Sequence, residues 1–448
     1  MPTLAGEEMI NVLPATYGIR WLDGIPAHWQ ITRSKRLFTQ RKEKARASDQ
    51  QLTASQEFGV IPQAHFMEKA GRQVVQVFLN PEILNHVEEG DFVISMRSFQ
   101  GGLEVAKATG CISSAYVVLK PSKIVHRGFF SYLLKSARYI QALQSTSNLV
   151  RDGQALRFEN FAMVDLPLLP LKEQQAIANF LDRKTAAIDA LIEKQQKLVE
   201  LLAEKRAALI NQAVTKGLDP NVPMKESGIP GIGEVPAHWQ VMALRRVLGL
   251  IEQGWSPQCE GHPVSGNDWG VLKSGCTAGG CFNENANKTL PTSLEPRLQL
   301  LVREGDVLVC RASGSPDIIG SAALVPTMEK RLMLSDKIFR LNFVNLVHPA
   351  FVVHALASRA SRSQIENMIS GAEGLANNLP QARLKDLMFA RPPYRDQIAI
   401  AQWLESELER LDNVRAVIAG QLSRLQEYRQ ALITAAVTGQ LEIPEARQ

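Results

Sequence analysis

The segment Arg391–Tyr394 comes closest to a catalytic motif in this chain. It reads Arg-Pro-Pro-Tyr, whereas enzymes that methylate a flipped-out adenine place Asn or Asp before the two prolines to accept a hydrogen bond from the amino group of the base. Arginine carries donors and no acceptor, so it cannot hold that amino group. We therefore expect Pro392 and Pro393 to shape the backbone rather than to support catalysis.

Other signatures of catalysis or metal binding are missing as well. The sequence contains no Gly-x-x-x-x-Gly-Lys-Ser/Thr phosphate loop and no glycine-rich cofactor loop behind an expected strand. Pro316-Asp317 lacks the partner carboxylate and lysine of a nuclease. Cys276 and Cys281 are spaced one residue too far apart for a common zinc knuckle, and no paired histidine follows. We predict a protein that is not an enzyme and holds no metal or cofactor of its own.

His28 and His238 are the remaining candidates for chemistry, because both stand in the tetrapeptide Pro-Ala-His-Trp. A catalytic histidine needs a neighbouring group that orients it, and neither has one in the sequence. Since the tetrapeptide occurs twice, we predict a packing or capping role for both histidines.

This doubling extends to a long helical segment. Residues 171–216 contain no proline or glycine, and residues 395–438 match them without a gap at an offset of 223. Apolar residues recur at steps of three, four and seven, which predicts one apolar stripe on each helix. A helix about 65 Å long cannot bury such a stripe alone, so we predict that the two helices pair. The expected contact residues are Ile177, Leu181, Ile188, Leu191, Leu198, Leu202 and Leu209, with Ile400, Leu404, Leu411, Val414, Ile418, Leu425 and Leu432.

Gln195 and the lysines Lys184 and Lys205 are expected to fill the remaining places of the stripe. Gly217 and Gly439 follow the two segments and predict where the helices stop.

Each long helix follows a globular unit of mixed α+β composition. Glu-Gly-Asp turns at 89–91 and 304–306 precede alternating apolar runs that predict strands. We expect strands at 74–79, 92–96, 116–119, 307–310 and 337–341, helices at 129–144 and 351–369, and an irregular linker at 217–236.

Composition limits the class of protein. The chain has 448 residues, 45% of them hydrophobic, and is too long to fold around a single hydrophobic core. We therefore expect it to form two or more domains. A formal net charge of +5 is compatible with a nucleic-acid partner. There is no apolar run of membrane-spanning length and no secretory pattern at the N-terminus, and the five cysteines suit reduced thiols, so we expect a cytoplasmic location without membrane contact.

The doubled order of these motifs resembles the specificity subunit of type I restriction-modification systems. The resemblance rests on the Pro-Ala-His-Trp entries, the Glu-Gly-Asp strands, and the proline turns that lead into Glu173-Gln174 and Asp396-Gln397. The helix start typical of that family is Pro-Pro-x-x-Glu-Gln; here the second copy has aspartate in place of glutamate, and the first lacks the second proline.

The resemblance implies a domain organisation. Two target recognition domains, at 1–170 and 218–393, would alternate with two long antiparallel coiled-coil helices at 171–217 and 394–440, followed by a tail at 441–448. The molecule would then be a pseudo-two-fold internal repeat. Helices of this length would separate two DNA contacts by roughly one to two turns of the double helix.

The same resemblance implies the partners. They are double-stranded DNA, two methyltransferase (modification) subunits and two ATP-driven restriction or translocase subunits. S-adenosylmethionine, ATP and Mg would be bound by the partner subunits and not by this chain.

Residues that contact DNA are expected in loops at strand ends. Arg, Lys, Asn, Gln and Ser can donate to or accept from base edges, and the same residue types contact phosphates. The candidates are Arg97, Ser98, Gln100, Arg151, Gln154 and Arg157 in the first domain, and Lys273, Ser274, Arg311, Ser313, Asn377, Asn378 and Arg383 in the second. The basic residues within 33–46 could bind phosphates, although such a run more often forms a solvated face.

One alternative is a coiled-coil adaptor whose globular domains bind protein rather than DNA. A complete single-chain methyltransferase or nuclease is opposed by the missing motifs.

Overall fold

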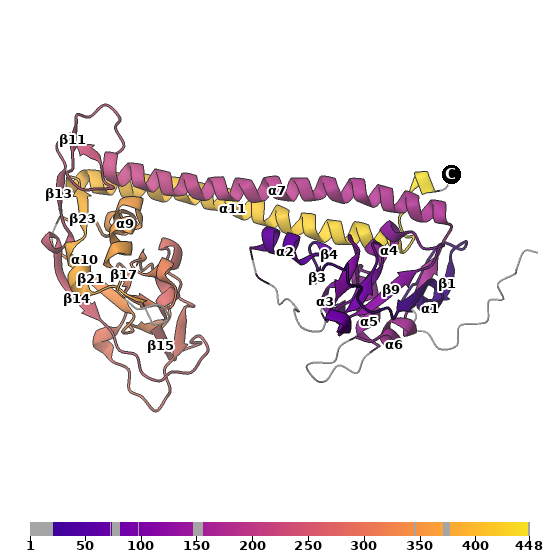
Figure 1. Ribbon diagram of the computed structural model, residues 1–448. Helices are drawn as coiled ribbons and strands as arrows, with labels where there is room; N and C mark the ends of the chain where they lie inside the picture. The colour runs from indigo at the N-terminus through magenta and orange to yellow at the C-terminus, as the bar shows by residue number, and fades with distance from the viewer. Residues whose placement is uncertain are drawn as a thin grey trace, which may run out of the picture. The chain divides into compact units, whose positions relative to one another are not determined.

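The computed structural model describes residues 21–71, 73, 81–96, 98–146, 156–344, 346–370 and 377–446. The chain divides into two compact units. The first combines residues 1–195 with 420–448, and the second comprises residues 196–419. Each unit contains one globular part and a portion of both long helices (Figure 1). The strand expected at 74–79 lies outside the described residues.

A four-stranded antiparallel sheet forms the centre of the first unit. Its strand order is β2 (Phe38–Arg41), β9 (Val117–Pro121), β6 (Phe92–Ile94) and β7 (Glu104–Val105). The strands expected at 92–96 and 116–119 are thereby confirmed. Phe38 is buried and makes edge-on contacts with Phe92, Phe130 and Phe161. Three two-stranded pairs surround the sheet: β1 (Gln30–Arg33) with β10 (Asp165–Leu168), β3 (Leu52–Ser55) with β4 (Gly59–Pro62), and β5 (Asn85–Val87) with β8 (Gly110–Ile112).

The second unit repeats this strand order. Its four-stranded sheet runs β14 (Leu248–Gln253), β21 (Ile338–Phe343), β17 (Val307–Cys310) and β19 (Ala322–Leu324). The strands expected at 307–310 and 337–341 are confirmed. A second, three-stranded sheet has no counterpart among the described residues of the first unit; its order is β16 (Asn287–Thr289), β15 (Trp269–Leu272) and β20 (Arg331–Met333).

Three two-stranded pairs complete the second unit. They are β11 (Met224–Glu226) with β12 (Glu234–Pro236), β13 (Gln240–Ala243) with β23 (Met388–Arg391), and β18 (Ala312–Ser313) with β22 (Asn377–Asn378). The first of these pairs corrects the expectation of an irregular linker at 217–236. Its strands are only three residues long, too short to give a clear alternating pattern.

Each of the two expected domain helices is in fact two helices. The segment 129–144 forms α4 (Arg127–Leu133) and α5 (Ala137–Gln144), and 351–369 forms α8 (Pro349–Ala357) and α9 (Arg359–Met368). Ser136 and Ser358 begin the second helix of each pair, because their side chains accept hydrogen bonds from the backbone of Tyr139 and Ser361. The other short helices are α1 (Ser34–Leu37), α2 (Gln63–Ala70), α3 (Ser98–Gly101), α6 (Phe158–Met163) and α10 (Gln381–Asp386).

The two long helices are α7 (Leu171–Lys216) and α11 (Tyr394–Val437). In the first unit the beginning of α7 packs with the end of α11, through Ile177, Leu181 and Leu432. In the second unit the end of α7 packs with the beginning of α11, through Val214 and Leu404. The helices therefore pair in an antiparallel sense in each unit. Gly217 and Gly439 follow them with φ of 76° and 71°, the left-handed conformation that ends a helix.

Two ion pairs between the helices are related by the repeat. In the first unit Arg429 donates from Nε and Nη2 to Asp189 at 2.8 and 3.0 Å. In the second, Arg206 donates from Nη1 to Asp412 at 2.8 and 2.9 Å. The offset of 223 carries Asp189 onto Asp412 and Arg206 onto Arg429, so the same interaction forms twice with the helices exchanged.

The expected stripe needs correction in the middle of the helices. Leu191, Leu198 and Val414 are 42%, 41% and 46% exposed. Steps of four and three residues, taken alternately from Leu181, define the face that packs against the other helix. This face includes the polar residues Thr185, Gln195 and Arg206, and it includes Ile192 and Val199 in place of Leu191 and Leu198. Lys184 and Lys205 are exposed, whereas Gln195 is half-buried as expected. The other expected contact residues are buried or half-buried: Ile177, Leu181, Ile188, Leu202, Leu209, Ile400, Leu404, Leu411, Ile418, Leu425 and Leu432.

Among the described residues, no helix combines the length and the apolar character needed to cross a bilayer.

Candidate nucleic-acid interface

Several of the candidate residues of the second unit lie at one edge of its main sheet, in loops attached to the strand ends. Gln253 at the end of β14 pairs with Phe339, and Cys310 at the end of β17 pairs with Ile338. The loops that follow β14 and β17 and the loop that precedes β21 therefore meet at the same edge. Loops held by a rigid sheet are suited to binding.

Arg311, Ser313, Asn377 and Asn378 are brought together there. Strands β18 and β22 pair Ala312 with Asn378 and Ser313 with Asn377. The backbone N–H of Leu379 donates to the carbonyl of Arg311 at 2.8 Å. More than sixty positions separate the two segments in the sequence, so the fold creates this polar group.

Arg311 is held on two sides within this group. Its guanidinium lies over the ring of Phe339 at 5.8 Å, and Nη1 donates to the carbonyl of Asp336 at 3.1 Å. A guanidinium has five donors in a rigid plane, and the Asp336 bond uses one of them. An arginine fixed in this way is suited to recognising a base edge or a phosphate.

The remaining candidates of the second unit differ in their surroundings. The hydroxyl of Ser313 accepts from the backbone N–H of Ser315 at 3.1 Å and so shapes its own turn. Lys273 and Ser274 are half-buried at the start of a 3-10 segment (Ser274–Gly280) that packs against β17 and β19. Arg383 is exposed on α10, which packs against the segment Leu244–Arg246 preceding β14 and against α9. The structure does not join Arg383 to the strand-end group.

The first unit has an equivalent edge. Arg41 at the end of β2 pairs with Val118, and Ile94 at the end of β6 pairs with Val117. Gln100 is exposed on α3, which follows β6. Arg157 is exposed just before α6, and its backbone N–H donates to Asn160 at 3.1 Å. Arg97, Arg151 and Gln154 lie outside the described residues.

Ser98 is a wrong candidate. Its side chain is completely buried, and its hydroxyl accepts from the backbone N–H of Ser95 at 2.9 Å. The hydroxyl therefore closes the turn after β6 and does not face a ligand.

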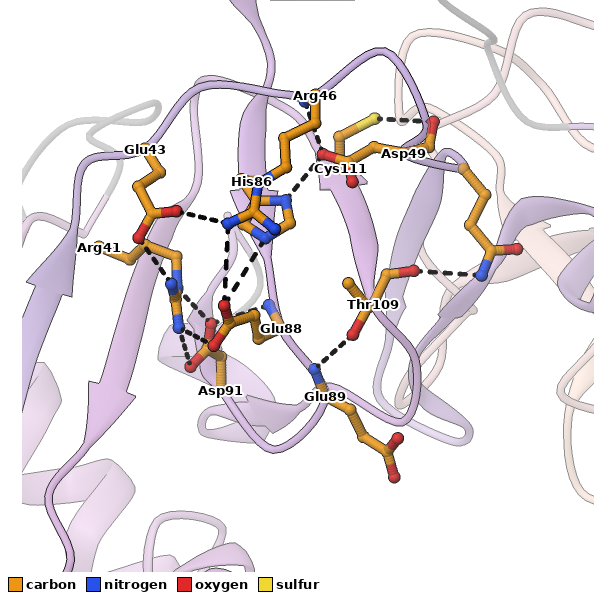
Figure 2. A network of polar contacts seen from close by, with 11 residues as sticks. Arg41, Glu43, Arg46, Asp49, His86, Glu88, Glu89, Asp91, Thr109 and Cys111 are labelled. Atoms are coloured by element: carbon orange, nitrogen blue, oxygen red, sulfur yellow. Dashed lines mark hydrogen bonds and ion pairs between the residues drawn. The ribbon is translucent and has the colours of Figure 1, made fainter.

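Arg41 and Arg46, near this edge, pair with carboxylates of the same unit (Figure 2). The buried Arg41 donates to Asp91, Glu43 and Glu88 at 2.7 to 2.8 Å. Burial acts to lower the pKa of Arg41, but the hydrogen bond and charge of Asp91, together with Glu88, raise it above its ordinary value. This bonding argues against Arg41 as a phosphate contact.

Two neighbouring cations have internal partners too. Arg46 pairs with Glu43 at 2.9 Å, and the Lys44 ammonium donates to Asn85 and to the Ile83 carbonyl at 3.1 Å. The run at 33–46 is therefore in part an internal network that stabilises the sheet edge.

The network also explains the repeated Glu-Gly-Asp turn. Asp91 accepts from the backbone of Glu88 at 3.0 Å and Asp306 from that of Arg303 at 2.9 Å, so each closes its turn. Asp306 also accepts from Arg340 on β21 at 3.1 Å, while Asp91 binds Arg41 on β2. The arginine that binds the turn aspartate therefore stands on the first strand of the sheet along the chain in the first unit and on the last strand in the second. The two copies of the sequence do not place arginine at matching positions, so the repeat did not predict this contact.

The repeated histidines have the packing role predicted for them. His28 lies 3.0 Å from the Glu173 carboxylate at the start of α7, and the Trp29 indole donates to the same carboxylate at 2.9 Å. His238 lies 3.4 Å from Asp396 at the start of α11. Both contacts attach the Pro-Ala-His-Trp turn to the first turn of a long helix, and this explains why an acidic residue stands at 173 and at 396.

Comparison with known proteins gives consistent matches. Residues 26–201 match the family described as type I restriction modification DNA specificity domain. The chain is 28% identical to the EcoEI specificity subunit of Escherichia coli over 55% of this chain, and the match spans 40% of that protein. It is 22% identical to the MjaVIII specificity subunit of Methanocaldococcus jannaschii over 94% of both proteins.

Two solved structures share the fold. A chain from a type I R-M system assembly aligns with a TM-score of 0.63 and 15% identity, covering 93% of this chain and 99% of that one. The HsdS subunit of Thermoanaerobacter tengcongensis gives 0.50 and 14%, covering 93% and 98%.

The fold and the sheet edges define a class: mixed α/β units carried on long paired helices. Within that class, the sequence matches point to one particular family: residues 26–201 match its DNA specificity domain, and the whole chain is similar to a type I specificity subunit over 94% of its length.

Proposed function

We propose that this chain is the DNA-recognition subunit of a type I restriction-modification complex and is itself not catalytic. The observation that carries the proposal is the convergence of Arg311, Ser313 and Asn377 at one sheet edge. Such side chains can read base edges in the major groove. The matching family is a DNA specificity domain, which supports the assignment.

The recognised target is bipartite in this proposal. The two units present equivalent sheet edges, and the interhelical ion pair occurs once in each. These equivalences support a pseudo-two-fold arrangement with one recognition domain for each half of the target. Helix α7 has 46 residues and would be about 69 Å long, which corresponds to about 20 base pairs.

The chain also serves as a scaffold in this proposal. Apolar side chains on both long helices remain exposed in the structure: Leu191, Leu198, Leu201, Val414 and Val417. Exposed apolar stripes mark protein interfaces. We assign them to two methyltransferase subunits, joined in the full complex by two restriction subunits. S-adenosylmethionine, ATP and Mg belong to those partners.

The test is DNA retention by the chain purified with its methyltransferase partner. First, mapping methylated adenines in cellular DNA identifies both half-targets. Filter binding then compares that target with DNA in which either half is scrambled. We expect retention to fall at least about tenfold with either half scrambled, because each mismatch costs about 1–3 kcal/mol. Equal retention of all three DNAs would contradict the proposal and favour the protein-binding adaptor.

Arg311→Ala identifies the surface involved. We expect the variant to bind about tenfold more weakly and to discriminate less at one half of the target, because a bidentate arginine contact contributes about 1–3 kcal/mol. Arg383→Ala is the matched control in the same unit and should keep the discrimination.

A further inference from the structure

Two pockets with matching walls lie where the long helices meet the Pro-Ala-His-Trp turns. The first unit contains a pocket of about 300 Å³ and the second one of about 270 Å³. Each lies between the turn, the start of one long helix and the segment that follows the end of the other. Neither pocket includes a residue of the sheet edges described above.

The repeat carries one pocket onto the other. His28, Trp29, Glu173 and Ile177 line the first, and His238, Trp239, Asp396 and Ile400 line the second. The glycine that ends a helix closes each of them. A side chain at Gly439 or Gly217 would come within 3.2 or 3.1 Å of the tryptophan ring, so glycine keeps this corner open. Leu441 and Leu218 occupy the corresponding places beyond the glycines.

The walls combine apolar surface with carboxylates. Trp29 and Ile177 are buried beneath the first pocket and Trp239 and Ile400 beneath the second. Glu173 and Glu442 line the first, and Asp396 and Asp219 line the second, where Lys216 offsets part of the charge. A lining that combines aromatic and aliphatic side chains with carboxylates suits a lysine or arginine side chain, whose stem is apolar and whose head is cationic.

Glu173 can accept from such a cation without losing its present contacts. Its two oxygens accept from Trp29 and lie near His28, whereas a carboxylate offers about four acceptor positions. The histidines leave room as well, because the side chains of His28 and His238 are 58% and 48% exposed.

The two units have similar pockets but different elements inserted into their main sheets. Between the first and last strands along the chain of each main sheet, the second unit carries the three-stranded sheet of β15, β16 and β20, while the described residues of the first carry the strand pairs β3–β4 and β5–β8 and helix α2. Surfaces that read two different half-targets must differ, whereas two sites for one partner must be alike. The matching pockets therefore point to two copies of the same ligand.

We propose that each pocket receives a lysine or arginine side chain from one methyltransferase subunit, so that the two pockets fix a stoichiometry of two. This inference rests on the proposed function for the identity of the partner. The pocket chemistry itself follows from the walls described above.

The experiment replaces each exposed histidine by lysine. In His28→Lys and His238→Lys the new ammonium can pair with Glu173 or Asp396, as the histidine does, and so occupies the position of the partner's cation. Native mass spectrometry of the chain titrated with purified methyltransferase subunit reports the number of copies bound. His65→Lys is the control, because His65 is exposed on α2 and lines neither pocket.

We expect two copies on the unaltered chain and on His65→Lys, and one copy on each single pocket variant. The double variant should bind both copies at least about tenfold more weakly, because the charge contact of each pocket is lost. Leu218→Lys, on a 42% exposed residue of the second pocket, repeats the test without removing a histidine and should also leave one copy.

Two copies bound with unchanged affinity by the double variant would overturn the pocket proposal. The proposed function has a separate readout in sequence-dependent DNA retention by the unaltered complex. Its failure would show in that assay, whatever the stoichiometry of the pocket variants.

Discussion

Two buried glutamines, Gln174 and Gln397, show how a single residue type fixes the junction between a domain and a long helix. The carbonyl oxygen of Gln174 accepts from the backbone of His126 at 2.7 Å, and its amide donates to the carbonyls of Ile124 and Leu169 at 2.9 Å. Gln397 repeats all three bonds, to His348, Leu346 and Pro392. Glutamate could not donate the two amide bonds, which explains why glutamine occurs at both positions.

Replacing Gln174 by leucine should therefore destabilise the first unit strongly. The change leaves one backbone donor and two backbone acceptors without their partner, and we expect the free energy of unfolding to fall by about 2–4 kcal/mol in urea denaturation. Gln175→Leu, one residue away on the exposed side of α7, is the control and should change it by less than about 0.5 kcal/mol. Equal effects of the two changes would refute this account of the junction.

Glu252 provides a prediction about pH. The hydrogen bond from Arg340, at 2.6 Å, lowers the pKa of Glu252 below its ordinary 4.5, helped by Asn342 and opposed by burial. The folded state then binds fewer protons than the unfolded state, so this carboxylate adds stability above pH 4.5 that is lost as the pH falls through the lowered pKa. Urea denaturation across this acidic range should show a shallower decline for Glu252→Gln than for the unaltered chain. Parallel declines would contradict the assignment.

Single residues differ in how far their sequence context predicts their role. The doubled histidines were assigned correctly to packing because repetition beside a tryptophan is visible in the sequence. Ser98 and Arg41 were misjudged, because burial within an internal network depends on strands distant in the chain. Arg311, Ser313 and Asn377 were chosen by residue type and loop position, but only the fold places them together.

At the scale of elements, the long helices were predicted well and the short ones poorly. A gapless match over more than forty residues identifies both α7 and α11. The breaks at Ser136 and Ser358 interrupt continuous apolar patterns, and the capping serines were the signal that could have located them. The predicted stripe was wrong in the middle of α7, because it followed the leucines Leu191 and Leu198 rather than the strict alternation of steps of four and three residues.

This correction yields a paired prediction. Ile188 is 8% exposed on the paired face of α7, whereas Leu191 is 42% exposed. Ile188→Asp should lower the free energy of unfolding by roughly 3 kcal/mol, because it buries a carboxylate without a partner. Leu191→Asp should leave unfolding nearly unchanged and weaken binding of the methyltransferase subunit. Urea denaturation measures the first effect, and titration with that subunit measures the second. A strong loss of stability in Leu191→Asp with little loss in Ile188→Asp would show that Leu191 belongs to the paired face after all.

At the scale of the whole molecule, the proposed function makes the paired helices a ruler for the unread spacer of the DNA target. The two interhelical ion pairs set the conditions for testing it. A heptad inserted in α7 between Asp189 and Arg206, with a matching heptad in α11 between Asp412 and Arg429, preserves both ion pairs and the alternation of four and three. A heptad in α7 alone shifts one ion pair against the other and should disrupt the pairing.

The double insertion lengthens each helix by about 10.5 Å, which is close to three base pairs of DNA. Three base pairs also rotate the second half-target by roughly a third of a turn, since a turn takes about 10.5 base pairs. We therefore expect the original target to be lost, and binding, where it is regained, to require a spacer about three base pairs longer. Mapping methylated adenines in cells that carry the variant and its partners measures this directly. A target with an unchanged spacer would show that the helices do not set the distance, and the bipartite proposal would then need another source for its spacing.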